Sequence, residues 1–190
     1  MIPADEVVLS LSELQSRVLA SLVTQLVELL RGVDGADADQ GSPDPLWAQV
    51  GIGAAARAPA DPALARLFPD AYPDDAEASD DFRRYTQADL RERKLGDAQS
   101  VLDALGAGGE VTAGQARTWV ACLNDIRLIL GERMGLGVEQ ADPAADPVGD
   151  PQADPEPMAE LYDWLTAVQG HLIEVMVTAE EDLATGEDPA

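Results

Sequence analysis

Side chains suited to nucleophilic or acid–base chemistry are scarce in this 190-residue sequence, which has one cysteine, Cys122, and one histidine, His171. A structural zinc site takes four ligands, mostly Cys and His, and a Ser-His-Asp triad needs a histidine oriented by an acid. The chain therefore lacks the residues for a conventional zinc site or a histidine-based triad. His171 stands at the edge of an apolar stripe, so a packing role is favoured over pH sensing.

Cys122 lies in an apolar segment whose face runs from Trp119 to Leu130 in steps of three and four residues. At about 100° per residue, the thiol sits about 60° from the centre of that face, so we predict that it is half-buried. Its nearest basic residues are Arg117 and Arg127, and Arg127 projects from the opposite flank, so no feature predicts an activated thiolate. Cys122 is expected to be a small hydrophobe, with redox sensing as the alternative.

The 36 Asp and Glu residues offer many carboxylates but no catalytic or metal-binding pattern. Four Asp-Pro dipeptides fall between 139 and 157, where proline and charge repulsion favour an extended linker. A calcium-binding EF-hand loop needs the pattern Asp-x-Asp-x-Asp-Gly and a distal Glu, which this segment does not have. No Gly-rich phosphate loop, Gly-x-Ser-x-Gly elbow or His-Glu-x-x-His motif is found. We therefore expect no enzymatic activity, no cofactor and no metal.

The charge of the chain restricts its partners. With 36 acidic and 12 basic residues, the formal net charge is −24, which repels nucleic-acid backbones and anionic membranes. Direct DNA binding without a partner is therefore not expected. Five basic residues gather within twelve positions: Arg83, Arg84, Arg91, Arg93 and Lys94. Salt bridges are the ordinary use of such a cluster, and contact with an acidic surface of a protein partner is the alternative. The proline-constrained segment from Phe68 to Tyr72 is a second candidate for partner contact.

Periodic apolar residues predict an all-α chain, in which 1–190 forms one domain and four main helices pack as a compact bundle. A first helix is expected from Ser10, where Ser10 and Glu13 have the spacing of a capping box, to Gly32. The apolar run at 7–9 is at most a short strand, since a strand without an evident partner is unstable.

The remaining helices follow from caps and stop signals. One is expected from 86 to 105, one from Thr112, with Gln115 as its capping partner, to Gly135, and one from Pro157 to about 175. Short helical turns are expected at 61–68 and 79–85. Flexible loops at about 32–60 and 137–157 separate these elements, with Leu46 and Trp47 as anchors on the core.

The cellular compartment is predicted from three absences. The longest apolar stretch falls short of the roughly 20 residues of a membrane span. The N-terminus has no basic residue ahead of an apolar run, as a signal peptide would. A lone cysteine fits a reducing environment. We therefore expect a cytoplasmic protein.

Three stretches carry a family resemblance. Residues 61–75 read DPALARLFPDAYPDD and are followed by Phe82-Arg83-Arg84, residues 119–133 read WVACLNDIRLILGER, and residues 161–166 read LYDWLT. Together they resemble the signatures of an actinobacterial family of acidic, all-helical oxidative-stress transcription regulators, formerly a domain of unknown function. The resemblance covers about Leu9 to Val175, apart from the two loops.

The resemblance implies a regulator that acts through a sigma factor or RNA polymerase rather than by catalysis. Some members lie in genomes beside the Clp protease adaptor, so the alternative is an adaptor or assembly module of Clp-type proteolysis without redox sensing. The oligomeric state, a homodimer included, stays open.

The redox mechanism attributed to the family uses an intrachain Cys-x-x-x-Cys pair. Here Thr118 and Ile126 stand four residues to either side of Cys122, and there is no second thiol. An intrachain disulfide is therefore impossible. Either redox sensing is lost, or Cys122 pairs between two chains or with a small thiol, and the predicted half-burial argues against both pairings.

Overall fold

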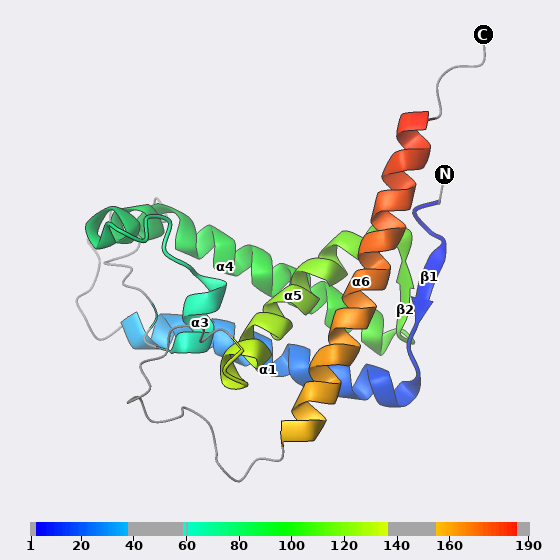
Figure 1. The fold of residues 1–190 in the computed structure, drawn as a ribbon, viewed down its shortest axis with the longest axis horizontal. Helices are drawn as coiled ribbons and strands as arrows, with labels where there is room; N and C mark the ends of the chain where they lie inside the picture. Colours follow the sequence, from blue (N-terminus) through cyan, green and yellow to red (C-terminus); the bar gives the residue numbers. More distant parts are fainter. Residues whose placement is uncertain (1–2, 38–58, 60, 137–154, 186–190) are drawn as a thin grey trace.

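The computed structural model describes residues 3–37, 59, 61–136 and 155–185. In chain order its elements are β1 (Val7–Ser10), α1 (Glu13–Asp37), α3 (Pro62–Leu67), α4 (Ala76–Gly106), β2 (Glu110–Thr112), a single 3-10 turn η1 (Ala113–Gln115), α5 (Ala116–Arg133) and α6 (Pro155–Thr185). The fold is all-α, as predicted, with one two-stranded sheet beside the helices (Figure 1). Among the described residues, no helix is both long and apolar enough to cross a membrane.

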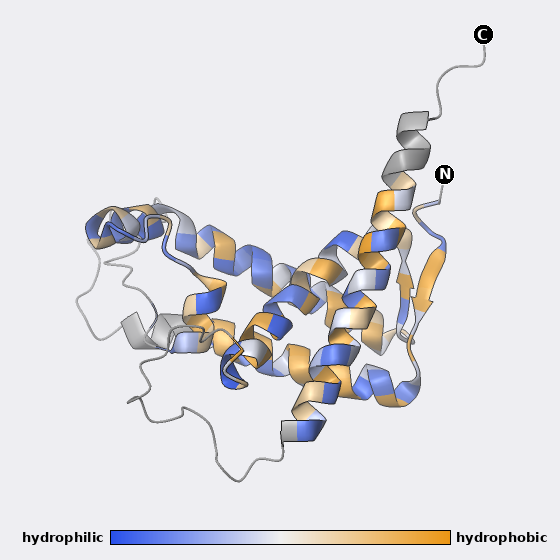
Figure 2. Ribbon diagram, in the orientation of Figure 1, coloured by the Kyte–Doolittle hydropathy of each residue, from blue (hydrophilic) through white to orange (hydrophobic). Residues whose placement is uncertain are grey.

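Helix α5 lies at the centre of the molecule and contacts α1, α3, α4 and α6. Its apolar residues repeat at three and four positions and extend around several sides of the helix, so that neighbours can bury it on each of them. Trp119, Leu123 and Ile126 are all buried. Helix α6 crosses α5 and continues past the body of the molecule (Figure 1). In Figure 2, β1 is mainly hydrophobic and α1 alternates between hydrophobic and hydrophilic bands, whereas much of α4 is hydrophilic.

The short strand at the N-terminus is stable because it pairs with a second strand that the sequence pattern did not predict. β1 pairs antiparallel with β2, with Leu9 opposite Val111 and Ser10 opposite Glu110. The turn before β2 depends on Gly109, whose φ is +74°. A Cβ at this position would lie 2.4 Å from the Ser16 hydroxyl oxygen, so only glycine fits here.

The predicted boundaries of the first helix are wrong at both ends. Helix α1 begins at Glu13, because Ser12 and Gln15 form the capping box in place of Ser10 and Glu13. The Ser12 amide donates to Gln15 Oε1 at 2.9 Å, and the Gln15 amide donates to Ser12 Oγ at 3.3 Å. The helix also passes through Gly32 and ends at Asp37, since a single helical glycine costs only about 1 kcal/mol.

The predicted break near Thr86 is absent, and α4 is one continuous helix. Asp75 caps it by accepting a hydrogen bond from the Ala78 amide at 3.0 Å. No proline or glycine interrupts residues 76–95. The Thr86 hydroxyl donates back to the Phe82 carbonyl oxygen at 2.9 Å, which keeps it within the helix instead of capping a new one.

Two other helix signals are confirmed. Gln115 Oε1 accepts from the Thr112 amide at 2.9 Å just ahead of α5. At the other end, Gly135 adopts φ +71° and the Leu136 amide donates to the Gly131 carbonyl, as in a glycine-terminated helix. The predicted anchors Leu46 and Trp47, and the Asp-Pro linker up to 154, lie outside the described residues.

Candidate functional site

Cys122 is buried, so the prediction of half-burial is wrong. Its residue exposure is 1%. The helical wheel placed the thiol beside the apolar face of its own helix, but it could not show that α4 packs against that flank. The α4 residues Lys94 and Asp97 lie close enough to act electrostatically on the thiol. The expectation that Cys122 serves as a small hydrophobe agrees with this position.

The surroundings of Cys122 oppose formation of a thiolate. Burial, followed by the negative charges of Asp125 and Asp97, raises the pKa of the Cys122 thiol to about 12, and Lys94 offsets only part of this. Peroxide and disulfides react with thiolates, which are scarce at neutral pH when the pKa is this high. In the folded protein, burial and the raised pKa therefore disfavour reaction of Cys122 with oxidants.

A buried ion pair lies beside the thiol and joins α4 to α5. Lys94 Nζ lies 2.7 Å from Asp125 Oδ1, and the side-chain exposures are 16% and 6%. Burial raises the pKa of Asp125 even though the hydrogen bond and charge of Lys94 act in the opposite direction. Lys94 is thus committed to the interior and is not available to a protein partner as a surface charge.

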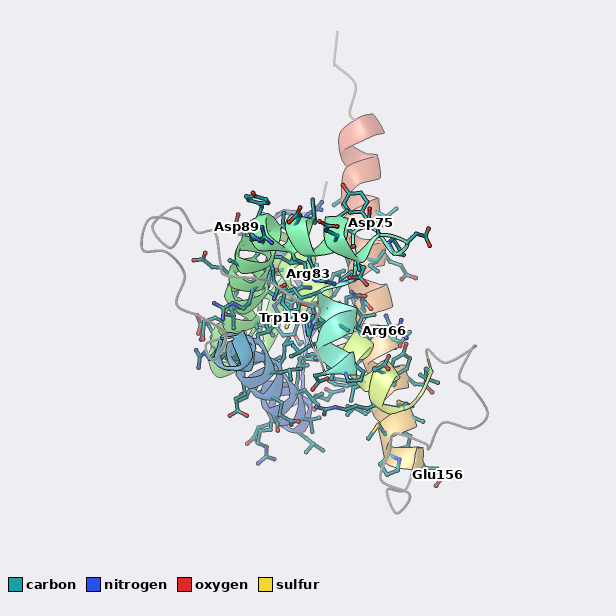
Figure 3. The ribbon with its side chains drawn as sticks, turned by 90° about the vertical axis from the view of Figure 1, so that its left-hand side faces the viewer. Arg66, Asp75, Arg83, Asp89, Trp119 and Glu156 are labelled. Atoms are coloured by element: carbon teal, nitrogen blue, oxygen red, sulfur yellow. The ribbon has the colours of Figure 1, made fainter. Side chains whose placement is uncertain are left out.

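Arg83 is also directed inward. Its side chain is 6% exposed; Nη2 donates to the Phe68 carbonyl oxygen at 3.1 Å and lies 2.5 Å from Asp70 Oδ1. Asp80, on the same helix, lies 3.6 Å from Nη1. In Figure 3, Arg83 points into the molecule, while Asp75 and Asp89 lie at its outer edge. Arg83 therefore ties the segment before α4 onto that helix.

The five predicted basic residues do not converge into one patch. Arg84 lies 3.3 Å from Asp81 on its own helix. At about 100° and 1.5 Å per residue, Arg84 and Arg91 share one flank of α4, Arg93 lies on another side, and Arg83 and Lys94 are about 16 Å apart along the axis. Salt bridges, the ordinary prediction, account for Arg83, Arg84 and Lys94. This placement does not support the alternative of a cationic surface for an acidic partner.

The segment from Phe68 to Tyr72 divides between core and surface. Phe68 is 2% exposed and belongs to the hydrophobic core, so it cannot contact a partner in this fold. Tyr72 is 50% exposed, and its ring packs edge-on against Phe82 with 6.2 Å between centroids. The buried Ser79 fixes the backbone of Tyr72. Its hydroxyl donates to the Tyr72 carbonyl oxygen at 2.8 Å and accepts from the Tyr72 amide at 3.0 Å.

Two exposed aromatic residues beside Tyr72 were not predicted as contact residues. Phe82 and Tyr85 are 47% and 62% exposed on the outer side of α4. Both residues fall in the predicted short turn at 79–85, which is too short to show a helical face. Counting phase at about 100° per residue along one continuous helix from 76 to 106 would have placed Tyr85 about 140° from the middle of the buried Ser79–Arg83 face and Phe82 about 80° from it, at the edge of the exposed side.

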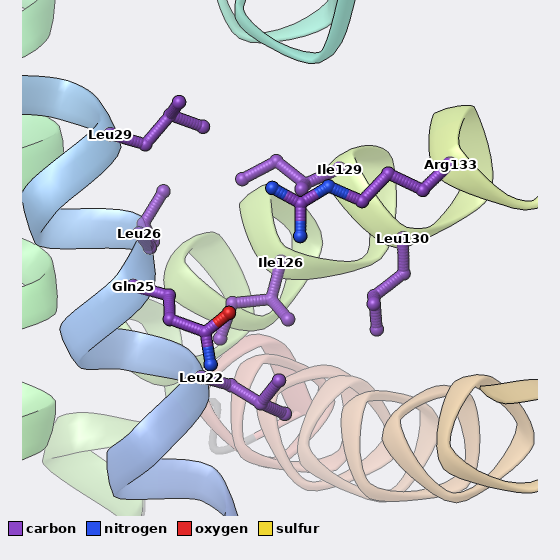
Figure 4. Close-up of a pocket in the computed structure, with 8 residues that line it drawn as sticks. All are labelled: Leu22, Gln25, Leu26, Leu29, Ile126, Ile129, Leu130 and Arg133. Atoms are coloured by element: carbon purple, nitrogen blue, oxygen red, sulfur yellow. The ribbon is translucent and has the colours of Figure 1, made fainter. Parts of the chain in front are cut away.

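Two hollows among the described residues are poor sites for a small molecule. Figure 4 shows a crevice between α1 and α5, lined mainly by leucine and isoleucine, with Arg133 and Gln25 among its polar lining residues. Its free volume is about 30 Å³, which is the share of about one water molecule. A wide depression between α3 and α5 is open to solvent and contains the Arg66–Glu132 ion pair at 2.6 Å. Within the described ranges, no group of three or more Cys, His, Asp or Glu side chains is arranged to hold a metal ion.

His171 joins α6 to the sheet. Its Nε2 lies 2.8 Å from the Val8 carbonyl oxygen, a hydrogen bond that requires the ring proton on Nε2. Nearby, Arg127 of α5 donates to Gln169 and to the Tyr162 hydroxyl, and its guanidinium lies 5.0 Å from the centre of the Tyr162 ring. These contacts hold α6 in place, in line with the packing role expected for His171.

Comparison with known proteins agrees with the predicted resemblance. The chain is 32% identical over 185 residues to the oxidative stress regulator AosR of Mycobacterium tuberculosis and of Mycobacterium bovis, covering 85% of this chain and 83% of theirs. It is 31% identical over 170 residues to a putative oxidative stress regulator AosR of Mycobacterium leprae, covering 80% and 76%. No solved structure matches. The model of the family described as "Domain of unknown function (DUF2017)" matches residues 2–176, and the chain therefore belongs to the DUF2017 family.

Proposed function

We propose that this protein regulates the response to oxidative stress by binding a protein partner of the transcription machinery, a sigma factor or RNA polymerase, in the cytoplasm. The relatives that carry the name of oxidative stress regulator align over more than four fifths of each chain, so the likeness spans most of the sequence. Action through a partner, without catalysis, is the part that the structural features of this chain support.

The observation that carries the proposal is the burial of Cys122. The chain's single thiol is sealed between α4 and α5, and its pKa is raised to about 12. A regulator that sensed peroxide itself would need an accessible thiolate. The oxidative signal must then reach this protein from outside, through the state or abundance of what it binds.

Direct DNA binding is disfavoured by the same structure. Each phosphate contact needs an uncompensated cation, yet Arg83, Arg84 and Lys94 each lie against a carboxylate. The surrounding charge of −24 adds long-range repulsion. A protein partner that itself contacts DNA accounts for transcriptional control without this difficulty.

Affinity purification from the native host tests the proposal. The tagged protein and its Cys122→Ala variant are purified from cells with and without peroxide, and the co-purifying proteins are quantified by mass spectrometry. We expect a sigma factor or RNA polymerase subunits with both forms, because the thiol is not the sensor. Recovery of Clp components alone would instead support a proteolytic adaptor. Tight, sequence-specific binding of promoter DNA by the protein alone would contradict the proposal.

A further inference from the structure

We propose that the exposed aromatic residues Tyr72, Phe82 and Tyr85, here called the aromatic patch, form a docking surface for a segment of a protein partner rich in Arg and Lys. This inference rests on the proposed function, in that it takes the protein to act by binding another protein. It adds the location of the contact and the chemistry of what is bound.

The aromatic patch gathers apolar surface that the fold leaves uncovered. Its three side chains are 50%, 47% and 62% exposed, although the chain has only eight aromatic residues in all. Phe82 and Tyr85 are three residues apart on one helix and are therefore neighbours on its surface, and the Tyr72 ring packs against Phe82. Tyrosine is enriched at the centres of protein interfaces, where it supplies large contact area and a polar tip.

The aromatic patch is held in a defined shape. Both backbone polar groups of Tyr72 bond to the Ser79 hydroxyl, at 3.0 and 2.8 Å. Arg83 fastens the same segment by bonding to the Phe68 carbonyl oxygen and to Asp70. A surface that is already ordered loses little conformational entropy on binding, which favours recognition.

The charge around the aromatic patch selects a basic occupant. Residues 70–89 contain seven acidic and two basic residues, a net of −5. The two basic residues, Arg83 and Arg84, are already paired with Asp70 and Asp81. Exposed aromatic faces attract guanidinium and ammonium groups by cation–π interaction, and the surrounding carboxylates complement the same cations. Nucleic acid and a second copy of this chain are both anionic and are repelled.

A binding titration separates specific docking from general attraction to an acidic protein. The probe is a fluorescent synthetic peptide rich in Arg and Lys, and its counterpart has every basic residue replaced by Glu. The variants are Phe82→Ala and Tyr85→Ala, and the matched control is Leu14→Ala, which removes a side chain that is 64% exposed. Leu14 lies near the start of α1, at the other end of the molecule from the start of α4 (Figure 1). None of these changes alters the net charge.

We expect each aromatic variant to bind the basic peptide about tenfold more weakly, as is usual when an interface anchor is truncated. Leu14→Ala should bind like the unchanged protein, and the Glu peptide should not bind. Equal affinity across all variants would show that binding depends on net charge alone and would overturn the inference. Circular dichroism confirms that the variants are folded.

Photo-crosslinking in the host distinguishes this inference from the proposed function. Tyr85 is replaced by p-benzoylphenylalanine in one protein and Leu14 in another, and the cross-linked peptides are sequenced. A basic segment attached at 85 and not at 14 supports the docking surface. If that segment belongs to a protein unrelated to transcription, the docking surface stands and the proposed function fails. If a sigma factor or RNA polymerase co-purifies equally with Phe82→Ala and Tyr85→Ala, the function stands and the docking surface is refuted.

Discussion

Helix α4 contributes to two regions of this protein that differ in how far their charged and reactive groups are exposed to solvent. Around Cys122, the second half of α4 meets α5, and the charges of Lys94 and Asp125 are paired within the interior. At the start of α4, the aromatic patch faces solvent, and acidic residues outnumber basic ones. The thiol is thus buried, whereas the three aromatic side chains of the patch are among the exposed large hydrophobic groups of the described structure.

The difference indicates which surface of this protein is open to contact with other molecules. A sealed thiol with a raised pKa contributes to packing, and its surroundings disfavour thiolate chemistry. An exposed, ordered aromatic surface can form contacts without any rearrangement of the fold. We therefore expect the two regions to differ strongly in chemical reactivity. We also expect substitution of the buried ion pair beside Cys122 to cost more stability than substitution at the aromatic patch.

The largest expected effect is on the reactivity of Cys122. Because burial, together with the charges of Asp125 and Asp97, raises the pKa of its thiol to about 12, the thiolate fraction near pH 8 falls on the order of a thousandfold below that of the unfolded chain. Iodoacetamide should therefore modify the native protein about a thousandfold more slowly than the protein in urea, as followed by mass spectrometry. Comparable rates in the two states would show that the thiol is accessible and would erase the contrast between the regions.

Substitution of Asp125 should produce the largest loss of stability among these tests. Asp125→Ala leaves the Lys94 ammonium group buried without its partner, which should lower the free energy of unfolding by about 3 kcal/mol in urea titrations. The control is Lys94→Met combined with Asp125→Leu, which removes both charges and should restore most of that loss. A single variant as stable as the unchanged protein would mean that Lys94 reaches water easily.

Removal of the Ser79 hydroxyl should have an intermediate effect confined to the aromatic patch. Ser79→Ala removes both hydrogen bonds to Tyr72, and we expect a loss of about 1–2 kcal/mol in the free energy of local opening at Tyr72. Hydrogen exchange at the Tyr72 amide should become faster, while amides around Cys122 keep their protection. Ser100→Ala serves as the control, since that exposed hydroxyl bonds only within its own helix. Loss of protection in both regions would indicate that they unfold as one unit.

The smallest effect concerns Asp97, near the thiol. Burial raises the pKa of this carboxyl above 3.8, so its contribution to stability is present below the unfolded pKa and is lost as pH rises through the folded pKa. Asp97→Asn does not titrate and should be more stable than the unchanged protein at neutral pH, by roughly 0.5 kcal/mol or less because solvent screens the charge of this partly exposed side chain. The gain should vanish in acid, as measured by thermal unfolding across pH. A gain that is independent of pH would point to a cause other than burial of this charge.

Much of the helical structure was predictable because it depends on neighbouring residues. The Thr112–Gln115 cap, the Gly135 stop and the apolar face of α5 are signals within a few residues of where they act. The boundaries of α1 and α4 were predicted wrongly because a second local signal competed with the predicted cap in each helix. Ser12 displaced Ser10 as the cap, and Thr86 bonded back into its helix.

The candidate sites were predicted less well, since exposure depends on segments far apart in the chain. Phe68 and Tyr72 are four residues apart in one proline-rich stretch, yet one is in the core and the other is on the surface. Arg83 and Lys94 belong to one sequence cluster, but Asp70 and Asp125 draw both inward. β1 likewise needed β2, about a hundred residues later, as its partner.

The sequence by itself determined the anionic charge, the absence of any intrachain disulfide and the all-helical character of the chain, because these follow from composition and local periodicity. Only the tertiary structure decided that Cys122 is sealed, that Arg83 and Lys94 of α4 are paired with carboxylates of other segments and that Tyr72, Phe82 and Tyr85 face solvent. A helical repeat specifies which side chains share a face, whereas burial requires another element to cover that face, and packing between distant segments supplies it.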